Sequence, residues 1–180
     1  MNKIPSRLLF LVTTGFALAA CTLKKPKTTA ASPNYQAPVS MVAAPANIKA
    51  VCYSDADLST YRVRMVQQEL AVGVLSCKDA AGNRRLTEKY QAFVNKFGSD
   101  LSTNAAEIKA MAGRKRLNLD VVVTEIANRT AQQPSVDPTF CSRHERAFDW
   151  SLTSQVTSLT QVPAPYDFGP EMKVFACPRA

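Results

Sequence analysis

The sequence predicts an all-α domain, an up-down bundle of about four helices with an irregular C-terminal tail stapled by disulfides. Three observations predict it. Apolar residues recur at steps of three and four along four stretches between residues 54 and 152. Prolines gather after residue 152, and four cysteines follow residue 49. Together they place one helical domain over residues 50–180, which is long enough for a single core.

The first helix is expected from Ser54 to Cys77. The stretch SDAD places an acid three residues after a serine, which is typical of a helix N-terminus. One apolar stripe follows, made of Val63, Val66, Leu70, Val74 and Cys77 and widened by Leu58, Tyr61 and Met65.

The second helix is expected over residues 86–113. Gly98 costs about 1 kcal/mol relative to alanine inside a helix, but the apolar face keeps its phase across it. This favours one long, kinked helix over two antiparallel ones. A third helix is expected over residues 117–132, although the β-branched run 121–123 is also compatible with a strand.

The fourth helix is expected to start with Asp137 as its cap and Pro138 in its first turn, and to extend to Leu152. The tail over residues 153–180 holds four prolines, so no long helix fits there. Its stretch MKVFAC either pairs as a short extended piece or lies along the bundle.

The four cysteines of the domain are expected to form two disulfides. A continuous helix of about 20 residues would hold Cys52 and Cys77 roughly 30 Å apart, too far for a bond between them. An up-down order of helices brings Cys77 to Cys141 and returns Cys177 to Cys52. The third possible pairing is favoured if the second helix is two antiparallel helices.

The first 20 residues have the parts of an export signal. Lys3 and Arg7 precede an apolar run that is about half the length needed to span a bilayer. The stretch LAAC, which ends at Cys21, resembles the lipobox of bacterial lipoproteins. The resemblance implies removal of residues 1–20, attachment of diacylglycerol to Cys21, and fatty acylation of the new amino terminus. With Thr22 after the cysteine, it also implies sorting to the outer membrane, facing the periplasm.

The positive charge lies mostly outside the domain. The net charge is +8, and it falls to +6 once Lys3 and Arg7 leave with the signal. Residues 22–49 carry four lysines and no acid, which leaves the remainder nearly neutral. Residues 21–49 therefore predict a lipidated cysteine followed by a disordered tether rich in proline, alanine and lysine. A nucleic-acid partner is not expected.

No catalytic, cofactor or metal site is expected. His144 is the only histidine and stands between charged neighbours, as surface or boundary histidines do. His144 lies three residues after Cys141, and no two cysteines are close in the sequence. Zinc sites usually have pairs of ligands that are closely spaced along the chain, and no such pair is present. Five acids of the predicted helices are assigned to solvated faces or helix starts: Glu69, Glu88, Asp100, Glu107 and Glu125.

Three aromatic residues are candidates for contact with a partner. Trp150, Tyr166 and Phe168 fall where the helical pattern ends, so they are not in phase with a core. Packing of the tail on the bundle is the alternative. The stretches MVQQELAVGVLSC, EKYQAFVNKF and TFCSRHERAF are similar to small envelope proteins of unassigned function in Gram-negative bacteria, a resemblance that supplies no catalytic residues.

The sequence therefore predicts a lipid-anchored envelope protein with a structural or partner-binding role and no catalysis. An inhibitor or small-molecule-binding module of the periplasm is the first alternative. A hydrolase of the cell wall, with two carboxylates as its catalytic groups, is the weaker one.

Overall fold

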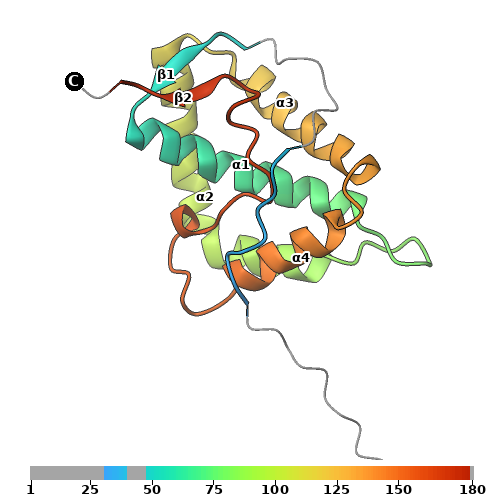
Figure 1. The fold of residues 1–180 in the computed structure, drawn as a ribbon. Helices are drawn as coiled ribbons and strands as arrows, with labels where there is room; N and C mark the ends of the chain where they lie inside the picture. Colours follow the sequence, from blue (N-terminus) through green and yellow to red (C-terminus); the bar gives the residue numbers. More distant parts are fainter. Residues whose placement is uncertain (1–30, 40–47, 179–180) are drawn as a thin grey trace, which may run out of the picture.

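A computed structural model describes residues 31–39 and 48–178 of the chain (Figure 1). Within these residues the structure is mainly helical, which confirms the predicted fold class. The elements in chain order are β1 (Val51–Tyr53), α1 (Asp55–Ser76), α2 (Thr87–Lys115), α3 (Leu119–Gln132), the 3-10 turn η1 (Gln133–Ser135), α4 (Phe140–Ser151), the 3-10 turn η2 (Leu159–Gln161) and β2 (Val174–Ala176).

Helix α1 runs through the middle of the domain and packs against each of the other three α-helices (Figure 1). Its start is the predicted one, because the Ser54 side chain accepts a hydrogen bond from the Asp57 amide at 3.2 Å. The expected apolar stripe is buried, with Val66 and Leu70 fully enclosed. The central helix therefore follows directly from the apolar period of the sequence.

Helix α2 is one long element with a kink. Phe97 has non-helical torsions (φ −109°, ψ 19°), and helical geometry resumes at Gly98. The sequence predicted this continuity and the position of the bend. The helix ends at Arg116, which adopts the left-handed conformation (φ 52°) common after a helix C-terminus.

Helix α3 begins two residues later than predicted and is not a strand. The Asn118 side chain accepts hydrogen bonds from the amides of Asp120 and Val121, as an N-cap does. The prediction for α4 was wrong at its start, because this helix begins at Phe140 and not beside Asp137. Asp137 instead caps the preceding turn by accepting the Thr139 amide at 2.7 Å.

The tail returns to the beginning of the domain. β2 pairs in parallel with β1, and the Cys177 amide donates to the Tyr53 carbonyl at 2.9 Å. Disulfides join Cys52 to Cys177 and Cys77 to Cys141, which confirms the predicted pairing. The first closes the strand pair, and the second ties the end of α1 to the start of α4.

Residues 31–39 pack on the domain, which differs from the disordered tether predicted for this stretch. Tyr35 is 1% exposed, and its hydroxyl donates to the Pro163 carbonyl at 2.7 Å. The Ala37 amide donates to the Pro165 carbonyl at 3.0 Å. Figure 1 shows this segment beside the C-terminal tail, in front of α1. An aromatic side chain with a buried hydroxyl partner gives a short polar segment enough contact to hold it.

Across the described parts of the chain, no helix combines the length and the apolar character needed to cross a membrane. The signal peptide, Cys21 and most of the predicted tether lie outside the described residues.

Candidate functional site

The aromatic residues predicted as a contact surface lie mostly inside the domain. Tyr166 is 1% exposed and Phe168 0%, so a contact surface is wrong for both and the alternative, packing of the tail on the bundle, is confirmed. Tyr166 stacks on Phe140, with 6.1 Å between ring centroids. Trp150 is half-buried, and its indole N–H donates to the Gln161 carbonyl at 3.2 Å. The tail folds back across α1, so aromatic residues outside the helical period still complete the core.

His144 is fully buried, which corrects its predicted surface or boundary position. Its ring lies against Gly73 of α1, and Nδ1 pairs with the Phe140 carbonyl oxygen at 2.8 Å. Burial lowers the pKa of the imidazole to about 4, although backbone carbonyls of Phe140 and Glu69 favour its protonated form. At neutral pH this side chain is an uncharged part of the contact between α1 and α4.

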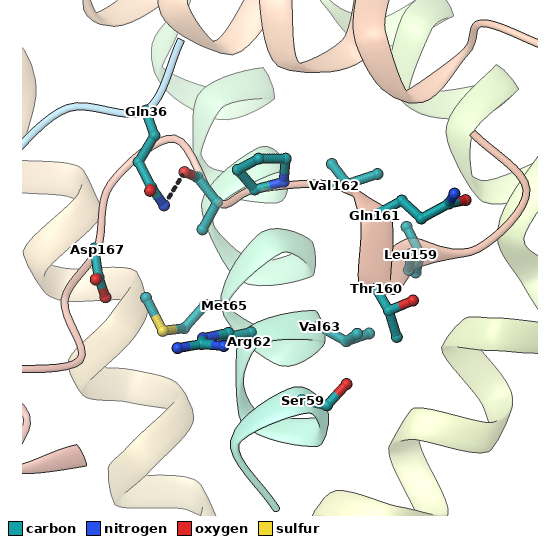
Figure 2. A pocket seen from close by; sticks show the side chains of 12 residues that line it. Gln36, Ser59, Arg62, Val63, Met65, Leu159, Thr160, Gln161, Val162 and Asp167 are labelled. Carbon is teal, nitrogen blue, oxygen red and sulfur yellow. Dashed lines mark hydrogen bonds between the residues drawn. The ribbon is translucent and has the colours of Figure 1, made fainter. Parts of the chain in front are cut away.

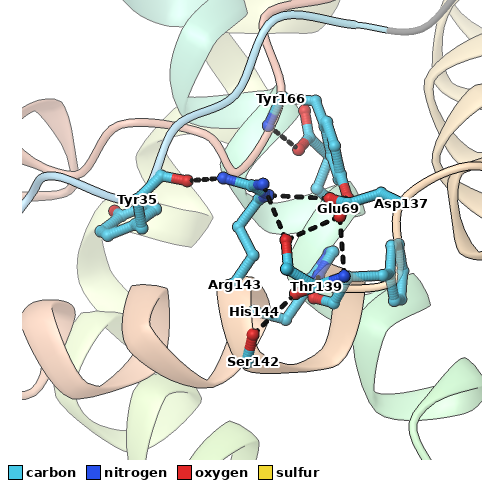
Figure 3. Close-up of polar contacts among 9 residues, drawn as sticks. Tyr35, Glu69, Asp137, Thr139, Ser142, Arg143, His144 and Tyr166 are labelled. Carbon is cyan, nitrogen blue, oxygen red and sulfur yellow. Dashed lines mark hydrogen bonds and ion pairs between the residues drawn. The ribbon is translucent and has the colours of Figure 1, made fainter.

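Glu69 is the second buried group that the sequence placed on a solvated face. Its side chain is 0% exposed, and Oε2 accepts the Tyr166 amide at 2.8 Å (Figure 3). Burial raises the pKa of this carboxyl well above its ordinary value of 4.5, and the Tyr166 N–H opposes the rise only in part. The carboxyl therefore fixes the tail to α1 from within the core.

Asp137 forms the polar link between this core and the surface. It accepts hydrogen bonds from the Tyr166 hydroxyl at 2.6 Å and from Arg143 Nε at 3.0 Å. Partial burial opposes ionisation, but the bonds from Thr139, Tyr166 and Arg143 lower the pKa of Asp137. Arg143 also donates to the carbonyl of Tyr35 (Figure 3). The cluster thus joins α4, the tail and residues 31–39.

This buried cluster has the residue types of an acid-base site but lacks access. Glu69 and His144 are both enclosed, and neither lines any of the pockets described below. A buried polar network of this kind specifies how elements pack. We therefore assign Glu69, Asp137, Arg143 and His144 a structural role.

The surface is hollowed on the side of α1 that faces η2. A pocket of about 280 Å³ lies between α1 and the stretch 159–164 (Figure 2). Its lining includes the apolar side chains of Val63 and Met65 and the charged side chains of Arg62 and Asp167. No described residue forms an ion pair with either of these two charges. We call this hollow the η2 groove.

A second pocket, of about 220 Å³, opens on the other side of η2, between α1 and α2. It shares Ser59, Val63, Leu159 and Thr160 with the η2 groove, so the two hollows are neighbours. Its remaining lining residues are mainly polar and include two carboxylates: Thr60, Asp100, Thr103, Asn104, Glu107 and Ser158. We call it the acidic pocket.

In the part of the chain that the structure describes, no three histidine, cysteine, aspartate or glutamate side chains gather as a metal site would require. Comparisons with protein-family models, with curated proteins and with solved structures find no match for this chain. The candidate site therefore rests on its own geometry.

Sequence reasoning missed the two polar residues that matter most around α1. Asn104 is 3% exposed, and it lies three residues after Leu101 and four before Ile108, within the apolar stripe of α2. Glu69 lies four residues after Met65 on the buried face of α1. A polar residue in phase with an apolar stripe was the available signal in both cases.

Proposed function

We propose that this protein is a non-enzymatic, lipid-anchored component of the cell envelope whose helical domain binds another envelope protein through the η2 groove. The observation that carries the proposal is a groove whose lining combines apolar side chains with two charged ones, Arg62 and Asp167, that form no ion pair among the described residues. Such a surface combines apolar contact with charge pairing, as protein interfaces do.

The anchor is inferred from the lipobox-like stretch that ends at Cys21. Two disulfides support an oxidising compartment outside the cytosol, because thiols are kept reduced inside it. A diacylated and acylated cysteine holds a protein on a bilayer far more firmly than a single chain does. We propose the periplasmic face of the outer membrane as the location.

A polypeptide partner suits the groove better than a small molecule does. The η2 groove has a volume of about 280 Å³, at or below the low end of the range for small-molecule sites. The acidic pocket adjoins it on the other side of η2. An extended or helical segment of a partner can cross η2 and place side chains in both hollows.

The absence of catalysis is part of the proposal. It is supported by the burial of His144, which leaves that imidazole without access to substrate. Asp100 and Glu107 are the two carboxylates of the acidic pocket. They lie seven residues apart on one helix, or roughly 10 Å along its axis.

Photo-crosslinking in living cells tests the interface. A photoreactive residue replaces Arg62 in the η2 groove, and in a matched control it replaces Leu75. Leu75 is 53% exposed on the same helix, roughly 20 Å further along. We expect a discrete crosslinked envelope protein from position 62 and none from position 75. Equal labelling at both positions, or no adduct at position 62, contradicts the proposal.

Mass spectrometry of the native protein tests the anchor. We expect a mature chain that begins at Cys21 and carries fatty acids. A chain that retains residues 1–20, or a mature terminus without lipid, contradicts the proposed location. The crosslinking result is independent of this outcome.

A further inference from the structure

We propose that the acidic pocket binds a lysine or arginine side chain of the partner. This inference rests on the proposed function and names the chemistry that the partner brings to the pocket. It is argued from the lining of the pocket, from one buried amide oxygen and from the absence of an internal counter-charge.

The lining offers mainly acceptors. Asp100 accepts the Leu159 amide through Oδ2 at 2.8 Å, and Glu107 accepts the Thr60 hydroxyl through Oε2 at 3.1 Å. No basic side chain among the described residues forms an ion pair with either carboxylate. The pocket therefore holds two uncompensated negative charges on a chain whose net charge is positive. A cationic group is the complement that this lining lacks.

Asn104 supplies the second, independent observation. Its Nδ2 donates to the Thr60 carbonyl at 2.8 Å. Asn104 lines the pocket, and because a carbonyl oxygen can only accept, this bond fixes the orientation of its amide. Oδ1 is buried and has no hydrogen-bond partner. A buried acceptor without a donor is destabilising, and an N–H group of a side chain bound in the pocket would supply the donor.

The spacing of these groups fits a long cationic side chain. Asp100, Asn104 and Glu107 lie at i, i+4 and i+7, so they share one face of α2. Two carboxylates roughly 10 Å apart cannot both touch one ammonium group, but one carboxylate and the amide between them can. Val63 and Leu159 line the same pocket and provide apolar contact for the methylene stem. A lysine or arginine side chain has both parts.

NMR titration of the isotope-labelled mature chain in detergent micelles tests the chemistry. The probes are N-acetyl-lysine methylamide and N-acetyl-arginine methylamide, with N-acetyl-norleucine methylamide as the uncharged control. We expect saturable shifts at the amides of Thr60, Asn104 and Leu159 with at least one cationic probe, and none with norleucine. Equal shifts with norleucine, or none with either cation, overturn the inference.

Charge-neutralising variants test the assignment to these residues. Glu107→Gln keeps the shape of an exposed side chain, and we expect it to weaken probe binding roughly two- to fivefold. The double variant Asp100→Asn with Glu107→Gln should abolish saturable binding. Glu88→Gln is the matched control, because Glu88 is exposed on the same helix outside the pocket. Equal affinities for Glu88→Gln and Glu107→Gln overturn the inference.

The same double variant separates this inference from the proposed function. We expect it to reduce the adduct formed at position 62 in cells. An undiminished adduct overturns the inference but leaves the proposed interface standing. Probe binding without any adduct at position 62 assigns the pocket to free small amines, which overturns both the proposed function and the partner side chain.

Discussion

The imidazole of His144 lies so close to Gly73 that a Cβ atom on residue 73 would stand 2.3 Å from His144 Cδ2. No side chain fits in that space. Helices α1 and α4 can therefore approach at this point only because residue 73 is glycine. The imidazole of His144 therefore packs against α1 in the space that a side chain at residue 73 would occupy.

Gly73→Ala should therefore destabilise the domain, by about 1–3 kcal/mol, because the core must shift to admit one methyl group. The measurement is the free energy of unfolding in urea. Gly113→Ala is the matched control, since nothing lies within 4 Å of a Cβ at that helical position. The control should be unchanged or more stable by up to about 1 kcal/mol. A Gly73→Ala protein as stable as the control would contradict the close contact.

Glu69→Gln should stabilise the protein at neutral pH. The pKa of Glu69 is raised in the folded state, so its contribution to stability is full below the unfolded value near 4.5 and is lost as the pH rises above it. Each pH unit of this loss amounts to about 1.4 kcal/mol while the folded carboxyl stays protonated. Glutamine keeps an acceptor for the Tyr166 amide. Unfolding free energies at pH 5 and pH 8 measure the effect, and Glu88→Gln should show none.

In the Glu69→Gln variant, the pH dependence of the unfolding free energy should show the titration of His144. The pKa of this imidazole falls from 6.5 to about 4 on folding, so its contribution is full above pH 6.5 and is lost as the pH falls toward 4. The loss amounts to about 3 kcal/mol. In the natural protein Glu69 acts in the opposite sense, so we expect Glu69→Gln to lose stability more steeply between pH 6.5 and 4. A pH profile parallel to that of the natural protein would refute the burial of these groups.

Tyr35→Ala should release residues 31–39 from the domain. The amide of Ala37 donates to the Pro165 carbonyl, and we expect its hydrogen exchange to lose protection in this variant while that of α2 is unchanged. Tyr35→Phe removes only the hydroxyl bond to Pro163 and should cost about 1 kcal/mol. Asn34→Ala, which alters an exposed side chain, is the control. Unaltered protection at Ala37 in Tyr35→Ala would show that the segment is held by other contacts.

Removal of either disulfide should destabilise the protein. The bonds join residues that are 125 and 64 positions apart, and closing loops of such lengths contributes about 4–5 kcal/mol on the chain-entropy estimate. Paired alanine variants at Cys52 and Cys177, and at Cys77 and Cys141, can be compared by urea unfolding with the natural protein under reducing and oxidising conditions. A peptide linking Cys52 to Cys77 in a non-reducing map would contradict both the pairing and a continuous α1.

The sequence by itself determined the local elements and the order in which they connect. The apolar period fixed the phase of α1 and α2, including the continuity of α2 past Gly98, because a helix repeats its contacts every three to four residues. The length of the first helix excluded a bond between Cys52 and Cys77, and the up-down order of helices favoured the pairing that the structure shows. The start of α4 was misjudged because Asp137 and Pro138, which suit a helix start, here cap a turn before it.

Only the tertiary structure decided which polar residues are enclosed and where the surface is hollowed. His144 is buried where α4 packs against Gly73 of α1. Glu69 and Tyr166 are buried because the tail and residues 31–39 fold across α1, a contact between segments more than 90 positions apart. The η2 groove and the acidic pocket exist for the same reason, since η2 rests on α1 and α2. Contacts between such distant segments produce no periodic pattern in the sequence. Whether a single polar side chain is buried at such a contact therefore cannot be predicted from local patterns.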